Sequence, residues 1–195
     1  MDKQLEIMYQ SSTCIKYIKG ELDKVYNMCI NQSTIKRSNQ LYEKALAQAK
    51  KEVFDNIKKL SIHHENDNIA DPIHLDLTKP KTWFNLGKHR TFSAIFCINI
   101  FQVAPISIAD GMMECAANLL DSAGFLLIYG PFQMEGAFTT DSNKEFHETL
   151  SSAGVSEWGL KDVADLKKAA ANHGLELKEQ IDMPANNFSL IFGRK

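Results

Sequence analysis

Residues Phe92–Ile100 read Phe-Ser-Ala-Ile-Phe-Cys-Ile-Asn-Ile, a nearly continuous apolar run of strand length. Such a run is typical of a strand buried on both faces, as in a parallel sheet. A second apolar run, Phe125–Tyr129, ends at Gly130, and Ser107–Leu120 between the two runs has a helical pattern. Strand, helix and strand in this order predict a parallel βαβ unit.

The C-terminal part of the chain continues this pattern. A helix is predicted from Asp162 to His173, with Gly174 in the position that commonly follows a helix C-terminus. Two strands, Leu175–Ile181 and Phe188–Phe192, are joined by a short polar connection and are expected to pair. The fold class is therefore α/β, a mainly parallel sheet with an antiparallel edge.

Upstream of the βαβ unit the sequence has a mainly helical pattern. Residues Ile73–Leu77 are predicted to form a short strand, and the apolar spacing of Ser38–Leu60 is that of an amphipathic helix. A weaker helical pattern covers Ser12–Met28. We expect one domain overall, composed of a divergent helical segment over 1–66 and an α/β part over 67–195.

Composition excludes several classes of protein. The 195 residues are 44% hydrophobic with a net charge of −2, which is typical of a globular protein and argues against a nucleic-acid partner. The sequence contains no apolar run long enough for a membrane span and no signal-peptide pattern. The four cysteines form no Cys-x-x-Cys pair, so no disulfide framework or metal site is expected. We expect a cytoplasmic location, with the nucleus left open.

Polar residues follow the predicted strands at their carboxyl ends. Asp76, Asn99 and Tyr129 each end a strand, and ligands of open parallel sheets bind at this edge. A carboxylate, an amide and a phenol on one rim are able to orient a polar small molecule. The alternative for each is structural: Asp76 caps a turn, Asn99 bonds to a loop backbone, and Tyr129 packs.

Several catalytic motifs are absent from the sequence. There is no phosphate-binding P-loop and no Gly-x-Ser-x-Gly nucleophile motif. Gly20 is the only glycine before Gly87, so no glycine-rich loop follows a first strand. His147 and His173 are expected at the surface.

Six motifs in order give the chain a family resemblance over residues 69–195. They are Leu75-Asp76-Leu77-Thr78, Cys97-Ile98-Asn99-Ile100, Tyr129-Gly130-Pro131-Phe132 with Gly136, Ser142-Asn143, Trp158-Gly159-Leu160-Lys161-Asp162 and Met183-Pro184-Ala185-Asn186-Asn187. Together they resemble the methyltransferase-like protein 26 family, a class-I S-adenosylmethionine-dependent methyltransferase-like group.

The resemblance implies a Rossmann-like seven-stranded sheet that ends in an antiparallel strand pair, with S-adenosylmethionine as cofactor. It places Asp76 near the adenine of the cofactor. It also places the residues after the next strand, Asn99, Phe101 and Gln102, at the cofactor and the methyl-transfer site.

The chain departs from the family pattern at three places. The family usually has a histidine where this chain has Gln102, and an aspartate where it has His147; an amide does not titrate and cannot replace a general base. The family's first strand and its glycine loop have no counterpart. We therefore expect a truncated or misassembled gene product, a relative without catalysis whose N-terminal helices repack over the sheet, or a chain whose sheet is completed by a partner or a second copy.

Two functions remain open at this point. As a methyltransferase acting on a small polar molecule or a protein, the chain would use Asn99, Gln102 and Tyr129 as catalytic residues. The remaining candidates for the substrate pocket are Asn143, Trp158, Asn186 and Asn187. Their structural alternatives are core packing for Trp158 and a tight turn for the paired asparagines.

As a scaffold without catalysis, the chain would bind a partner, with the Ser38–Leu60 helix as one candidate element. A nicotinamide-dependent oxidoreductase has less support, because it needs the same missing loop.

Overall fold

The structure is a computed structural model that describes residues 51–52, 55–56, 73, 75–79 and 91–195. The described residues from 75 onward belong to one compact unit. Residues 51–52 and 55–56, within the predicted Ser38–Leu60 helix, are helical. The predicted helix Ser12–Met28 lies outside the described residues.

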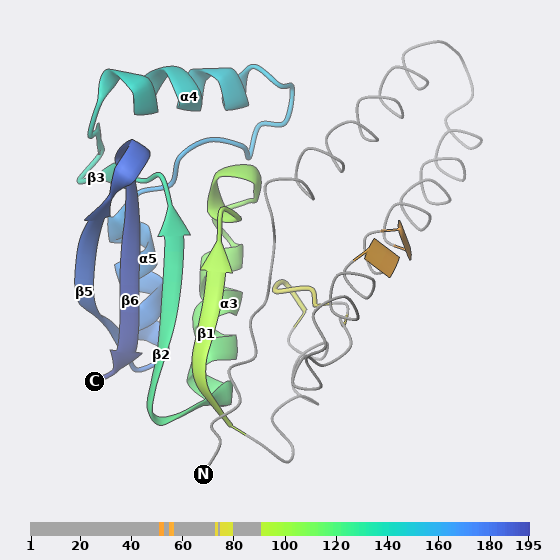
Figure 1. Cartoon of the computed structure of the whole chain (residues 1–195), viewed down its shortest axis with the longest axis vertical. Helices are drawn as coiled ribbons and strands as arrows, with labels where there is room; N and C mark the ends of the chain where they lie inside the picture. The colour runs from red at the N-terminus through yellow and green to blue at the C-terminus, as the bar shows by residue number, and fades with distance from the viewer. Residues whose placement is uncertain (1–50, 53–54, 57–72, 74, 80–90) are drawn as a thin grey trace. The chain divides into compact units, whose positions relative to one another are not determined.

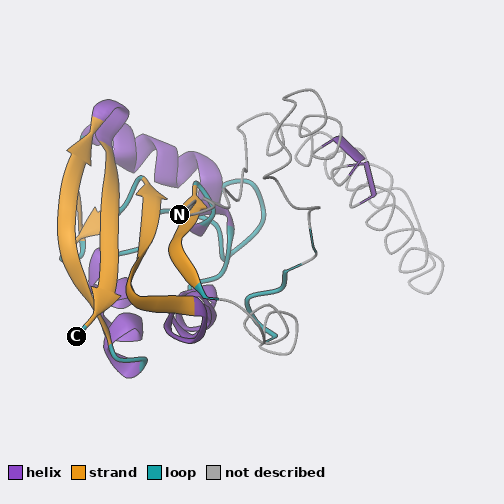
Figure 2. Cartoon of the chain, turned by 60° about the horizontal axis from the view of Figure 1, so that its bottom comes forward, coloured by secondary structure: helices purple, strands orange, loops and turns teal. Residues whose placement is uncertain are grey.

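Four strands form the main sheet of the compact unit, in the order β1-β2-β6-β5 (Figures 1 and 2). Strands β1 (Phe92–Ile98) and β2 (Leu120–Gly130) pair in parallel. Strand β6 (Asn187–Arg194) lies between β2 and β5 (Leu175–Met183) and is antiparallel to both. The predicted α/β class with an antiparallel edge is confirmed, and in the described sheet β1 and β5 are the two terminal strands.

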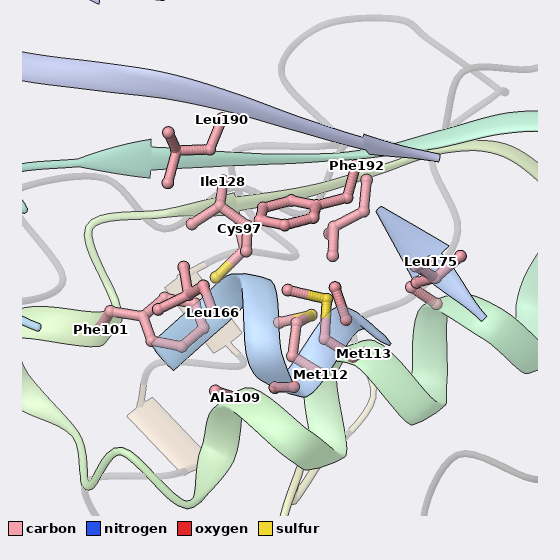
Figure 3. Close-up of a cluster of buried hydrophobic side chains, with 14 of the residues drawn as sticks. Cys97, Phe101, Ala109, Met112, Met113, Ile128, Leu166, Leu175, Leu190 and Phe192 are labelled. Atoms are coloured by element: carbon pink, nitrogen blue, oxygen red, sulfur yellow. The ribbon is translucent and has the colours of Figure 1, made fainter. Parts of the chain in front are cut away.

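Helices α3 (Ile108–Leu119) and α5 (Val163–Asn172) pack on one face of the sheet and enclose the core. Alternate residues of the strands point into this core, because side chains along a strand alternate between its two faces. Figure 3 shows the cluster, whose labelled members are Cys97, Phe101, Ala109, Met112, Met113, Ile128, Leu166, Leu175, Leu190 and Phe192. Each fully buried large side chain contributes about 1.5–3 kcal/mol.

The ends of α5 are set by its sequence, as predicted. The Asp162 side chain accepts a hydrogen bond from Ala164 N at 2.7 Å and caps the N-terminus. His173 is the C-cap, and Gly174 follows with φ 71°, a left-handed conformation that glycine adopts without strain. The His173 ring Nε2 lies 2.8 Å from Asp110 Oδ1 in the first turn of α3, which joins the two helices.

Short elements that follow the carboxyl ends of β1, β2 and β5 gather at one edge of the sheet (Figure 1). These are the 3-10 turn η3 (Phe101–Val103), the hairpin β3 (Gln133–Met134) and β4 (Ala137–Phe138), helix α4 (Asp141–Ser151) and the turn η4 (Pro184–Asn186). Helix α4 is polar, and of its residues only Asn143 is buried. Its N-cap is Thr140, whose side chain accepts from Asn143 N.

The predicted strand Ile73–Leu77 is not present in the part of the chain that the structure describes. Leu75 and Asp76 have no regular structure, and a turn follows in which Lys79 N donates to Asp76 O at 2.9 Å. This segment packs against α3 instead of pairing with a strand. A Cβ on Gly111 would lie 1.8 Å from Leu77 O, so only glycine permits the close approach.

Arg194, the last residue of β6, forms hydrogen bonds with the C-terminal end of α3. Its Nη2 donates to Ala117 O at 2.8 Å and to Leu120 O at 2.9 Å, two carbonyls at the helix C-terminus that lack partners within the helix. None of the described helices is long and apolar enough to cross a membrane.

Replacing Arg194 by methionine should lower the free energy of unfolding by about 1–3 kcal/mol, because two carbonyls lose a charged donor. Urea denaturation measures this, with Arg194→Lys as the control that retains the charge without the planar fork. An Arg194→Met variant as stable as the original protein would contradict the assigned role.

Candidate functional site

Two predicted site residues, Asn99 and Tyr129, are joined where the parallel strands end. Ile98 is in register with Tyr129, and Asn99 N donates to Tyr129 O at 2.9 Å. Asn99 then turns the chain with φ 54°, a left-handed conformation that asparagine tolerates better than most residues. The Tyr129 side chain is half-buried and lies on the sheet face opposite to Ile128 and the core.

The side chains of Asn99 and Gln102 meet over Gly130. A Cβ built on Gly130 would lie 3.5 Å from both Asn99 Oδ1 and Gln102 Oε1. The two amides therefore converge on one small space above a residue without a side chain. Because Asn99 follows β1 and Gly130 ends β2, this space lies at the carboxyl ends of two neighbouring parallel strands, where the sequence predicted a site.

Gln102 is a buried polar residue with 7% of its surface exposed. Its carbonyl oxygen accepts from Gly159 N at 2.9 Å, but its side-chain amide makes no hydrogen bond with any residue that the structure describes. Burying an amide without a partner costs about 1–3 kcal/mol. Such a group is suited to a ligand that supplies the missing hydrogen bonds.

Phe101, predicted beside the cofactor, belongs to the hydrophobic core. It is 2% exposed, and its ring packs at a tilt against Phe132, 6.2 Å away between centroids. The turn η3 directs its side chain inward.

The loop Glu157–Lys161 adjoins Gln102 through Gly159. Lys161 Nζ donates to Glu157 O at 2.6 Å and to Gly159 O at 3.0 Å, and partial burial lowers the pKa of this amine. Trp158 is half-buried, and its backbone closes a turn onto Val155 O. Trp158 thus directly precedes Gly159, whose N–H donates to Gln102 O.

The three asparagines predicted for the substrate pocket form a set of loop contacts. Asn143, 4% exposed, donates from Nδ2 to Thr139 Oγ1 and to Asn186 O, both at 3.0 Å. Asn187 Nδ2 donates to Pro184 O and Ala185 O within η4. These amides fix the shape of the edge, which corresponds to the structural alternative for the Asn186-Asn187 pair.

Asp76 forms a tight local turn. Its Oδ1 accepts from Thr78 N at 3.0 Å and from Thr78 Oγ1 at 2.6 Å, and Lys79 Nζ lies 2.9 Å from Oδ2. The Thr78 hydroxyl first, and then Lys79, lower the pKa of Asp76 to about 2. The carboxylate is therefore ionised and can only accept hydrogen bonds at neutral pH. These contacts correspond to the structural alternative for Asp76, a side chain that caps its own turn.

Two residues of this edge were missed as site elements by sequence reasoning. His147, expected at the surface, is half-buried, and its Nδ1 accepts from Leu160 N at 3.1 Å. Gly130 lies beneath the two amides, a role that only its position at the end of β2 could have indicated. Among the described residues there is no cluster of three or more His, Cys, Asp or Glu side chains that could hold a metal ion.

Comparison with known proteins gives one family and one fold. The family model described as Protein of unknown function (DUF938) matches residues 39–194. An O-methyltransferase family protein from Burkholderia thailandensis has a TM-score of 0.58 at 13% identity, over 77% of this chain and 41% of that one. The calicheamicin biosynthetic methyltransferase CalO1, in its SAH-bound form, has a TM-score of 0.51 at 12% identity, over 66% and 35%.

A third solved structure, LepI in complex with SAM, has a TM-score of 0.51 at 17% identity, over 66% of this chain and 31% of that one. This chain therefore spans between about a third and two fifths of the length of the solved proteins that it resembles. At these identities the likeness concerns the fold, which is the Rossmann-like fold of class-I methyltransferases.

Replacing Thr78 by valine should raise the pKa of Asp76 from about 2 towards its ordinary 3.8, because the hydroxyl is the largest cause of the shift. Since the folded-state pKa is lowered, Asp76 stabilises the fold above pH 3.8, and this contribution is lost as the pH falls through about 2. Carboxyl NMR titration measures the shift, with Thr78→Ser as the control. An unchanged Asp76 titration in the valine variant would contradict this assignment.

Proposed function

The chain belongs to the DUF938 family of proteins of unknown function, and we propose that it is an S-adenosylmethionine-dependent methyltransferase that acts on a small polar molecule or a protein. Its six motifs resemble those of the methyltransferase-like protein 26 family. The fold of the SAM-bound and SAH-bound neighbours supports the cofactor.

The observation that carries this proposal is the pair of amides over Gly130, with the buried side chain of Gln102 unpartnered among the described residues. A polar group of this kind is stable when a ligand completes its hydrogen bonds. The described residues therefore fit the cofactor or its methyl acceptor at the end of β1 and β2.

S-adenosylmethionine, when bound, supplies an electrophilic methyl group on a sulfonium. The chain contributes mainly position: Asn99 and Gln102 orient the polar groups of the ligands at the reacting end, where good alignment supplies much of the rate. Gln102 cannot remove a proton, so its role is to donate and accept hydrogen bonds. Asp76, held ionised, accepts hydrogen bonds from the amino or hydroxyl groups of the nucleoside.

A binding protein without catalysis is the second candidate, and one sequence observation favours it. Gly20 is the only glycine before Gly87, so residues 1–86 contain no glycine-rich loop of the kind that approaches the methionine end of such cofactors. As such a protein, the chain binds a partner's polar group at the rim, and the edge of β1 is completed by another chain or a second copy.

Replacing Gln102 by methionine separates a ligand role from a structural one. Methionine has a similar length and no amide, so the free energy of unfolding should stay the same or rise, because an unsatisfied buried group is removed. The affinity for S-adenosylhomocysteine should fall at least about tenfold, which corresponds to one hydrogen bond with a ligand.

Isothermal titration calorimetry measures this affinity, and Asn118→Ala is the control. Asn118 makes a polar contact on the exposed side of α3, donating to Glu114 O at 2.8 Å, and its replacement should leave binding unchanged. Unaltered affinity together with lost stability in Gln102→Met would overturn the ligand role. A cooperatively folded protein that binds neither S-adenosylmethionine nor its product would favour the binding protein without catalysis.

A further inference from the structure

Helix α4 lies across the carboxyl edge of the sheet (Figure 1). Asn143 and His147 are four residues apart on it and therefore share one face of the helix. Each bonds to a different loop: Asn143 Nδ2 donates to Asn186 O, and His147 Nδ1 accepts from Leu160 N. One contact uses an amide that does not titrate, and the other uses an imidazole that does.

The imidazole of His147 is held on two sides. The ring of Phe138 packs against it edge to face, with 5.0 Å between centroids. On the other side, a Cβ on Gly159 would lie 2.8 Å from His147 Cε1, so the ring lies directly against the peptide backbone. Gly159, with φ 135°, has a conformation that other residues rarely adopt.

This backbone segment leads directly to the candidate site. Gly159 N donates to Gln102 O at 2.9 Å, and the next residue, Leu160, donates to His147 Nδ1 at 3.1 Å. Adjacent peptide groups thus connect the imidazole with the residue whose amide lies over Gly130.

The direction of the hydrogen bond decides how His147 responds to pH. Nδ1 accepts a hydrogen bond from Leu160 N, so it carries no hydrogen and the neutral ring has its hydrogen on Nε2. Protonation places a second hydrogen on Nδ1, directed at the N–H of Leu160. Leu160 is 4% exposed, so its N–H would then be left without a partner and without water.

Charged groups of both signs lie on the elements packed against His147. On the loop, the Lys161 ammonium bonds to Gly159 O and to Glu157 O. On α4 itself, Lys144 and Glu148 flank the ring in sequence. None of these charges changes the geometry at Nδ1, where a second hydrogen would meet the N–H of Leu160.

We infer that His147 is a positioning residue: in its neutral form it holds residues 158–160 against Gln102, and its protonation releases them. The holding and the release of residues 158–160 concern the protein alone. The expected effect on ligand affinity rests on the proposed function.

The test uses the full chain and compares the original protein with His147→Asn and His147→Ala. In the asparagine variant, Oδ1 has the same place in the side chain as Nδ1 of histidine and accepts the same hydrogen bond. Unlike an imidazole, the amide is not protonated between about pH 8 and about pH 5. Hydrogen exchange of the Leu160 amide, expressed as a protection factor at each pH from about 8 to about 5, the range in which histidine titrates, measures whether the bond is formed.

We expect the protection of Leu160 in the original protein to fall at least about tenfold as the pH is lowered, while His147→Asn keeps its protection and His147→Ala has little at any pH. Equal pH dependence in the original protein and in His147→Asn would overturn the inference. If His147→Ala does not fold, the comparison with His147→Asn still decides.

Affinity for S-adenosylhomocysteine over the same pH range separates the two proposals. A loss of affinity at low pH that His147→Asn abolishes supports both. Absence of binding at every pH would contradict the proposed function, while the exchange data would still support or overturn the role of His147. Binding that ignores pH while Leu160 is released would contradict the link from His147 to the ligand.

Discussion

The parallel pairing of β1 with β2 is the constraint on which the candidate site depends. Their register, with Ile98 opposite Tyr129, brings both strands to an end at the same edge, and the hydrogen bond from Asn99 N to Tyr129 O extends the pairing by one residue. Because the two strands leave the sheet side by side, Asn99 and Gln102 meet over Gly130. The buried core beneath them makes this register costly to change, since a shift by one residue would turn core side chains outward.

The fold was largely predictable because its main elements have strong local signals. Apolar runs of strand length predicted β1 and β2, and the C-terminal helix has both a capping aspartate and a terminal glycine. Helix α4 has a weaker signal: it has a capping threonine, Thr140, but of its own residues only Asn143 is buried. Contacts made by the polar residues of α4 with loops far away in the sequence are not visible as a periodicity.

The position of the candidate site could be proposed from the sequence, whereas the contacts of its individual residues could not. The rule that ligands meet parallel sheets at their carboxyl ends pointed to Asn99 and Tyr129. Asp76 was assigned to a strand because a short alternating pattern also fits an irregular segment packed on a helix, as Leu77 is against Gly111. Phe101 was expected at the ligand because it follows Asn99, but the turn η3 directs its ring into the core. The contact of His147 with Leu160 spans 13 residues and depends on tertiary structure.

The central claim is that the amides over Gly130 receive a ligand. Their side-chain NH2 groups give separate signals in a ¹⁵N-correlated NMR spectrum, so a titration with S-adenosylhomocysteine observes them directly. We predict that the signals of Asn99 and Gln102 shift together and saturably, and that those of Asn143, Asn187 and Asn118, which are bonded elsewhere, stay nearly unchanged. Saturable shifts confined to other residues, or no shift at all at millimolar ligand, would contradict this claim.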